Sequence, residues 1–217
     1  MRARHLVALA ALLVPGAALA QGVEGGAGAY NVQRRVWYQS AVHEQTGLLV
    51  GGGAALRLGR LRIGVDGVMG TLKAAETSAG DEDVTVRSTA VRALFAVAPA
   101  LLVGVQAEAR RFEADAGVTM WRLMGASLRF EPGLGREGVR ALADVSVLPA
   151  SSVSGGPKLT MAVEATLGVS VRLPRSPLGV RIAYRFERFD VEATGTSPER
   201  YEQFRGLVAE ASLRLGR

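Results

Sequence analysis

The chain of 217 residues contains no cysteine, which excludes a disulfide scaffold, a thiol nucleophile and a cysteine-ligated metal. Aromatic residues make up only 6% of the sequence, and only two histidines are present. The G-x-S-x-G, H-E-x-x-H and G-K-[ST] patterns of hydrolases, metalloproteases and nucleotide-binding proteins are missing. The sequence therefore predicts no catalytic motif, no metal site and no cofactor.

The sequence also has few long apolar runs, and none reaches the ~18 residues of a transmembrane helix. The N-terminal stretch MRARHLVALAALLVPGAALAQ has a basic start, a short apolar segment and an A-x-A pattern at Ala18 and Ala20, before Gln21. These features predict that residues 1–20 are a secretory signal peptide, removed after export through the Sec pathway. Residues 21–217 then form one domain.

The charged residues are unequal in number, with 26 Lys+Arg against 20 Asp+Glu and a formal net charge of +6. A basic balance can indicate binding to nucleic acid. Here the arginines are spread singly along alternating segments and are not clustered, so no nucleic-acid partner is predicted.

The most regular pattern is in Leu159–Leu173, LTMAVEATLGVSVRL, where every odd position is apolar and the even positions are mostly small, polar or charged. A period of two indicates a β-strand. A long strand with one apolar and one polar face suits a wall between lipid and water. The segment therefore predicts a transmembrane β-barrel.

Nine further segments have a similar length and pattern, and each approaches or exceeds the ~9–11 residues that a tilted membrane strand needs. The predicted fold is all-β, a single antiparallel up-and-down transmembrane β-barrel of about ten strands, with eight as the alternative. The predicted strands are Ala29–Ser40, Thr46–Leu58, Leu61–Ala74, Val84–Val97, Ala100–Phe112, Val118–Phe130, Val139–Leu148, Lys158–Leu173, Leu178–Val191 and Tyr201–Leu215.

The predicted connections alternate between short and long. The short ones include Gly59-Arg60 and Ala98-Pro99, and the long ones include Ala41–Gln45, Glu113–Gly117 and Pro149–Pro157. Bacterial outer-membrane barrels place short turns in the periplasm and longer loops outside the cell. The alternation therefore predicts that both termini lie in the periplasm, and that prolines fall in connections or at strand ends.

The mature chain resembles a small bacterial outer-membrane β-barrel protein, through the A-x-A signal followed by hairpins such as LRLGRLRIGVDG (Leu56–Gly67). The resemblance implies a place in the bacterial outer membrane, contact with membrane lipid and lipopolysaccharide, and folding by the barrel assembly machinery. The C-terminal sequence ASLRLGR departs from the family because it lacks a terminal aromatic residue. Aromatic girdle candidates are Tyr38, Trp121, Phe189 and Tyr201 at the outer interface, and Phe130, Tyr184 and Phe186 at the inner one.

Alternation places many charged residues on the lumen face, where they must be paired or hydrated. Their positions predict an arginine-rich layer near the periplasmic turns beneath a carboxylate-rich layer. The predicted lumen charges are Arg57, Arg62, Asp66, Glu108, Arg110, Arg129, Arg140, Asp144, Glu164, Arg172, Arg181, Arg185, Glu187, Glu210 and Arg214.

The preferred interpretation is a non-enzymatic structural or adhesive barrel with a salt-bridged interior. One alternative is a narrow channel for small solutes that favours anions. Another is an outer-membrane hydrolase that uses His43, expected in the first external loop with Ser40 and Glu44 nearby. A soluble calyx of lipocalin type would need an apolar interior, so the direction of Met161 and Leu167 distinguishes it from a membrane barrel.

Overall fold

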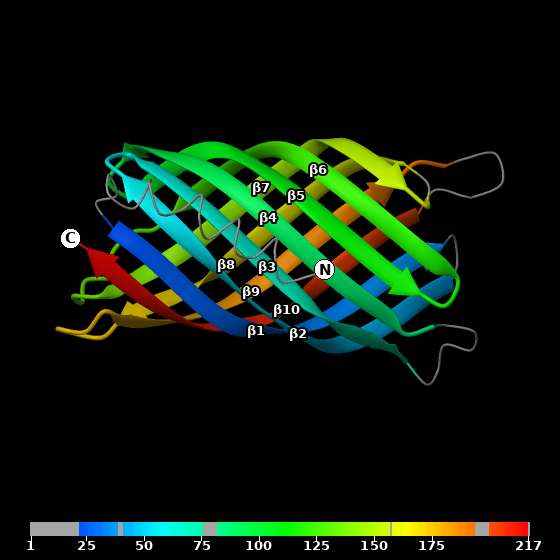
Figure 1. Ribbon diagram of the computed structural model, residues 1–217, viewed down its shortest axis with the longest axis horizontal. Helices are drawn as coiled ribbons and strands as arrows, with labels where there is room; N and C mark the ends of the chain where they lie inside the picture. Colours follow the sequence, from blue (N-terminus) through cyan, green and yellow to red (C-terminus); the bar gives the residue numbers. More distant parts are fainter. Residues whose placement is uncertain (1–21, 39–40, 76–81, 157, 194–199, 217) are drawn as a thin grey trace, which may run out of the picture.

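The computed structural model describes residues 22–38, 41–75, 82–156, 158–193 and 200–216. Within them the chain forms ten antiparallel strands that close into one barrel (Figure 1). The strands are β1 (Gly22–Tyr38), β2 (Ala41–Leu58), β3 (Leu61–Ala74), β4 (Val84–Ala98), β5 (Leu101–Ala114), β6 (Gly117–Phe130), β7 (Val139–Ser154), β8 (Leu159–Arg172), β9 (Leu178–Val191) and β10 (Arg200–Gly216).

Each strand pairs with its neighbour in the sequence, and β1 pairs with β10 from Gly22↔Gly216 to Tyr38↔Arg200. Closure removes the free sheet edges, so the strands satisfy each other's backbone hydrogen bonds. The predicted up-and-down barrel of ten strands is confirmed, and the eight-strand alternative is wrong. The described residues contain no helix that is long and apolar enough to cross a membrane. The predicted signal peptide, with Ala18, Ala20 and Gln21, lies outside the described residues.

The two ends of the barrel differ in what they carry. The end with Gly22, Gly216 and the β2–β3, β4–β5, β6–β7 and β8–β9 connections is called the terminal end, and the opposite end is the distal end (Figure 1, left and right). Two predicted long distal loops are wrong, because β2 already begins at Ala41 and only residues 115–116 separate β5 from β6. The hydrogen-bonded ladder continues there through pairs such as Trp37↔Val42, which lengthens the hairpins.

The outer surface of the barrel is apolar. Leu167 is 62% exposed, Ile182 61% and Val105 59%, and Met161 also points outward. The outward direction of Met161 and Leu167 rules out the lipocalin-type calyx. Leu159 is the exception in its segment: it is buried because the register shifts between Leu159 and Met161 and turns its side chain inward.

A second irregularity lies in β7, which continues to Ser154 although it was predicted to end at Leu148. The pairing with β6 shifts where Met124 faces Ala150 and Ala126 faces Val147, so that Pro149 falls inside the strand. The prediction that prolines avoid strands is wrong at this position. A bulge tolerates proline because the ladder is already interrupted there and the missing N–H is not needed.

Gly104 allows a close approach between β4 and β5. It faces the lumen, and a Cβ atom on it would overlap the backbone carbonyl oxygen of Ala93. Strands in a narrow barrel must coil strongly, and glycine permits this where any side chain would force the backbone apart.

We expect Gly104→Ala to lower the free energy of unfolding by about 1–3 kcal/mol, because the backbone has to shift. Gly133 is the matched control, since a Cβ there meets open space, and Gly133→Ala should stay within about 0.5 kcal/mol of the wild type. Urea unfolding in detergent micelles measures both. Equal losses would contradict the close approach at Gly104.

Candidate functional site: the barrel interior

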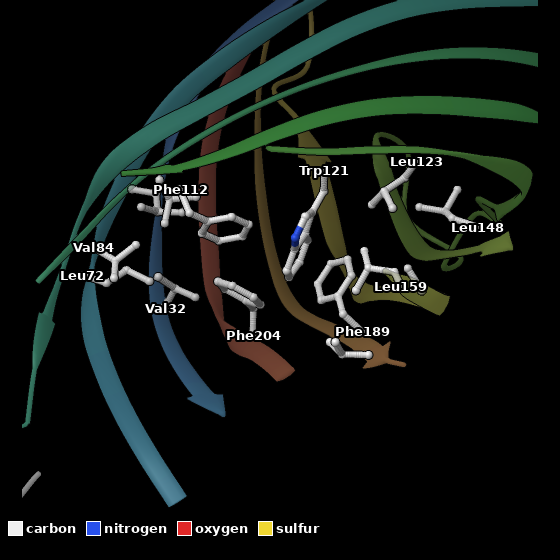
Figure 2. Packing of buried hydrophobic residues seen from close by; sticks show 14 of the residues in the cluster. Val32, Leu72, Val84, Phe112, Trp121, Leu123, Leu148, Leu159, Phe189 and Phe204 are labelled. Atoms are coloured by element: carbon white, nitrogen blue, oxygen red, sulfur yellow. The ribbon is translucent and has the colours of Figure 1, made fainter. Parts of the chain in front are cut away.

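The distal part of the lumen is filled by four aromatic rings, contributed by β5, β6, β9 and β10. Ring centroids are 4.5 Å apart for Phe112 and Trp121, 4.8 Å for Trp121 and Phe189, 5.8 Å for Phe189 and Phe204, and 6.0 Å for Phe112 and Phe204. Figure 2 shows the four rings gathered inside the sheet. We call them the aromatic layer. Apolar side chains surround it, among them Val32, Leu72, Val84, Val86, Leu123, Leu148, Leu159 and Val191.

The aromatic layer corrects the girdle prediction, because Trp121 and Phe189 point into the lumen and not toward lipid. Residues two apart on a strand share a face. Phe189 therefore lies on the same face as Glu187, which alternation had already assigned to the lumen, and Phe112 likewise follows Arg110. This shared parity is the signal in the sequence that could have placed Phe189 and Phe112 in the lumen. Tyr201, another girdle candidate, stacks on Trp37 with centroids 4.5 Å apart.

Next to the aromatic layer, Arg110 joins three carboxylates from three strands. Its guanidinium lies 2.7 Å from Glu108, 2.5 Å from Glu187 and 3.6 Å from Glu164. The four side chains are at most 6% exposed. A buried charge of this kind is stable only when it is paired and hydrogen-bonded, and Arg110 meets both conditions.

Two more arginines complete this central network. Arg185 pairs with Glu187 and lies 3.7 Å from Glu164, and Arg92 lies 3.9 Å from Glu164. Ser88 and Gln106 donate hydrogen bonds to the carboxylates, Ser88 to Glu108 at 2.7 Å and Gln106 to Glu164 at 2.8 Å. Three guanidinium groups thus face three carboxylates, so the network is formally neutral.

The network and the aromatic layer are in direct contact. The Arg110 guanidinium carbon lies 4.8 Å from the Phe189 ring centroid and 5.1 Å from that of Phe204. Arg34 lies 5.3 Å from the centroid of Phe112, and its guanidinium is held by Glu202 at 2.6 Å. Cation–π contacts of desolvated arginines add to the ion pairs. We call the aromatic layer and the central network together the interior plug.

Closer to the terminal end, arginines and carboxylates also pair at the same level. The pairs are Arg129–Asp144, Arg92–Asp66, Arg62–Glu24, Arg62–Glu131 and Arg181–Glu210. The predicted separation into an arginine layer under a carboxylate layer is therefore wrong within the barrel. Separated layers would leave each buried charge without a near counter-charge, which costs far more than pairing.

The remaining predicted lumen charges, Arg57, Arg140, Arg172 and Arg214, lie at the terminal opening and make no ion pair with any described residue. Sequence reasoning missed several paired groups. Glu24 precedes the predicted start of the first strand, and Glu131 falls in a predicted connection. Arg34 lies beside Arg35, where the alternation is interrupted.

Two adjoining cavities occupy the terminal part of the lumen. The outer one has a volume of about 520 Å³ and is bordered by the turns of the terminal end. The inner one, of about 170 Å³, lies along glycines of β1, β2 and β3 and reaches Tyr30, Arg92 and Arg185. Glu24, Arg62, Arg181 and Glu210 belong to the walls of both cavities.

At the distal rim, His43 lies in β2 opposite Val36, and not in a loop as predicted. Its neighbour Glu44 faces the other side of the strand, where Gln33 and Arg35 bind it. Ser40 lies outside the described residues.

The acidic residues Glu82 and Asp83, just before β4, bind neighbouring segments at the distal rim. The Lys73 ammonium donates a hydrogen bond of 2.5 Å to Asp83, and the backbone N–H of Ala74 donates another of 3.1 Å. These bonds hold the pKa of the Asp83 carboxyl below its usual range. Glu82 accepts a hydrogen bond from the backbone N–H of Ala116 at 3.1 Å. The described groups of His, Asp and Glu include none arranged to hold a metal ion.

The sequence matches no protein-family model and no curated protein. Among solved structures, the barrel is similar to the outer-membrane protease OmpT from Escherichia coli, with a TM-score of 0.60 and 8% identity over 89% of this chain and 97% of that one. It also matches Neisserial surface protein A (TM-score 0.38, 15% identity, 89% and 96% covered) and the attachment invasion locus protein Ail of Yersinia pestis (0.35, 10%, 89% and 98%). The chain therefore has the fold of outer-membrane β-barrel proteins.

We expect Glu187→Ala to lower the free energy of unfolding by roughly 3–5 kcal/mol, because Arg110 and Arg185 lose a shared partner in a buried site. Glu137→Ala is the control: this carboxylate is exposed at the terminal end, and its loss should change stability by less than about 0.5 kcal/mol. Denaturant titration of both variants in micelles measures the difference. A small cost for Glu187→Ala would mean that water hydrates the network.

Proposed function

We propose that the chain is an integral protein of the bacterial outer membrane, a non-enzymatic structural or adhesive barrel whose lumen is closed by the interior plug. The apolar exterior suits a lipid environment, and the fold is that of outer-membrane barrels. An even number of strands brings both termini to one end. In this proposal the terminal end faces the periplasm and the distal end faces outward.

The interior plug is the observation that carries the proposal. Phe189 and Phe204 are 0% and 1% exposed, and the buried network around Arg110 lies directly against them. The inner cavity ends at this network, because Arg92 and Arg185 form part of its wall. A conducting path for ions would need a hydrated route through this level.

Arginines on the outer face near the distal end support the orientation. Arg87 and Arg111 are register partners on β4 and β5, and Arg122 lies on β6 beside them. All three are exposed and alternate with buried residues, so they point away from the lumen. Guanidinium groups bind phosphate well, so this position suits contact with the phosphates of lipopolysaccharide.

In the hydrolase alternative, Glu44 would be the acidic partner of His43 that is adjacent in sequence. Glu44 does not support this role, because it faces away from His43 and is bound by Gln33 and Arg35. The channel alternative keeps the arginine-lined opening but has no open path past the interior plug. Export through the Sec pathway and folding by the barrel assembly machinery belong to the proposal as the route to the membrane.

If the exterior faces lipid, Leu167→Arg should destabilise the protein by about 2–4 kcal/mol, because Leu167 lies within the span of β8. Leu173→Arg is the matched control at the terminal end, where the cost should be about 0–1 kcal/mol. Unfolding from phospholipid vesicles measures both substitutions. Equal costs would argue against a bilayer around the barrel.

In planar bilayers, the refolded wild-type protein should give no stable conductance. The double variant Trp121→Ala/Phe189→Ala removes two rings of the aromatic layer and should allow ions to pass. Phe130→Ala, which removes an outward-facing ring, is the control and should remain closed. The folded state of each variant is checked by its resistance to detergent on electrophoresis. A steady anion-selective conductance of the wild type would contradict the proposal of a closed barrel and support the channel alternative.

A further inference from the structure

The outer cavity at the terminal end has an unusual charge composition. Its walls contain eight arginines and four glutamates, a formal net charge of +4 in about 520 Å³. Lysine and aspartate are absent from the described residues that line it. We call this cavity the vestibule.

The positive charge of the vestibule is only partly neutralised by the protein. Arg62 pairs with Glu24 at 3.2 Å, and Arg181 pairs with Glu210. The strand residues Arg57, Arg140, Arg172 and Arg214 have no carboxylate within ion-pair distance among the described residues. Four guanidinium groups are therefore available to a ligand.

In the deeper lumen, by contrast, the arginines are paired with carboxylates. Arg34, Arg92, Arg110, Arg129 and Arg185 all face the interior, and each pairs with at least one carboxylate. Unpaired positive charge is thus concentrated at the opening. The charges that act on Arg214 there are mostly of the same sign, from Arg172, Arg57 and Arg62, with Glu24 as an opposing charge. A set of like charges in a concave site raises the local concentration of anions.

A buried donor also lies without an acceptor at the inner boundary of the vestibule. The Nε–H of Arg181 is buried and has no hydrogen-bond partner, although Arg181 lines both cavities. Farther in, Tyr30 lines the inner cavity, and its hydroxyl is also buried without a partner. Buried donors are normally satisfied, so an oxygen of a ligand or of water in the adjoining cavity would complete the hydrogen bonding of these two groups.

We propose that the vestibule is a blind binding site for a phosphate-bearing anion, in which Arg172 and Arg214 contact the phosphate oxygens. Guanidinium groups bind phosphate through two parallel hydrogen bonds, and an all-arginine set favours this geometry over a point-charge contact. The interior plug closes the inner end, so the anion binds and leaves through the same opening. The phosphate belongs to a soluble anion or to a phospholipid headgroup that reaches the rim.

The test is equilibrium binding of inorganic pyrophosphate to the full chain refolded in phospholipid-free nonionic detergent. Binding should be saturable and should weaken as ionic strength rises. Arg172→Gln and Arg214→Gln should each weaken it about tenfold, as expected for loss of one charge-assisted contact. Arg136→Gln is the matched control, because Arg136 is an exposed arginine at the same end that does not line the vestibule. It should change the affinity by less than about twofold.

Competition then separates the two sources of phosphate. Stronger displacement of pyrophosphate by short-chain phosphatidylglycerol than by inorganic phosphate supports a headgroup site. The opposite order supports a soluble anion. The proposal is overturned if pyrophosphate shows no saturable binding, or if Arg136→Gln weakens binding as much as Arg172→Gln. Because the assay reads binding and not conductance, its result is independent of whether the barrel conducts ions.

Discussion

The pairing of Arg110 with Glu108, Glu164 and Glu187 is the interaction on which the interior depends. Inside the closed barrel these side chains have almost no contact with solvent. Each charged group therefore needs a partner of opposite charge, either on the same strand or on another strand. The three carboxylates come from β5, β8 and β9, which fixes the register of three strands relative to one guanidinium. Arg110 also supports the aromatic layer, because its guanidinium lies against Phe189 and Phe204.

The filling of the lumen is uneven along its axis. The rings of the aromatic layer come from β5, β6, β9 and β10, whereas nearer the terminal end the wall formed by β1, β2 and β3 is rich in glycine. Gly28, Gly51 and Gly53 leave no room for a Cβ beside the neighbouring backbone, so the strands approach closely and present no side chain to the lumen at these three positions. The inner cavity follows this wall. Large residues at one level of the lumen and glycines at another thus determine where the interior is filled and where it is hollow.

The period-two pattern was sufficient to predict the fold, because the strands alternate between an apolar face and a charged face over most of their length. In β9, for example, Arg181, Arg185 and Glu187 share one parity, and only Arg188 and Asp190 near the distal rim have the other. The pattern placed Glu187 and Arg185 in the lumen, where the structure has them. It failed where the period is interrupted: bulges at Leu159 and Pro149 change the face or extend the strand. The girdle prediction failed for Trp121 and Phe189, although their parity with the lumen residues Arg129 and Glu187 gives the correct face. Pairing partners such as Arg129 and Asp144 depend on register between strands, which one sequence does not reveal.

The distribution of charge along the barrel axis bears on whether the lumen binds an anion or conducts ions. A pore that selects anions would carry its excess positive charge at the narrowest point, where the field acts on the passing ion. In this barrel the central network is formally neutral and lies against aromatic rings, since Arg92, Arg110 and Arg185 face an equal number of carboxylates. The excess charge lies instead at the wide terminal opening, around Arg172 and Arg214. Positive charge placed before a closed wall can concentrate and hold an anion but cannot select one for passage, so the arrangement favours a site that binds over a path that conducts.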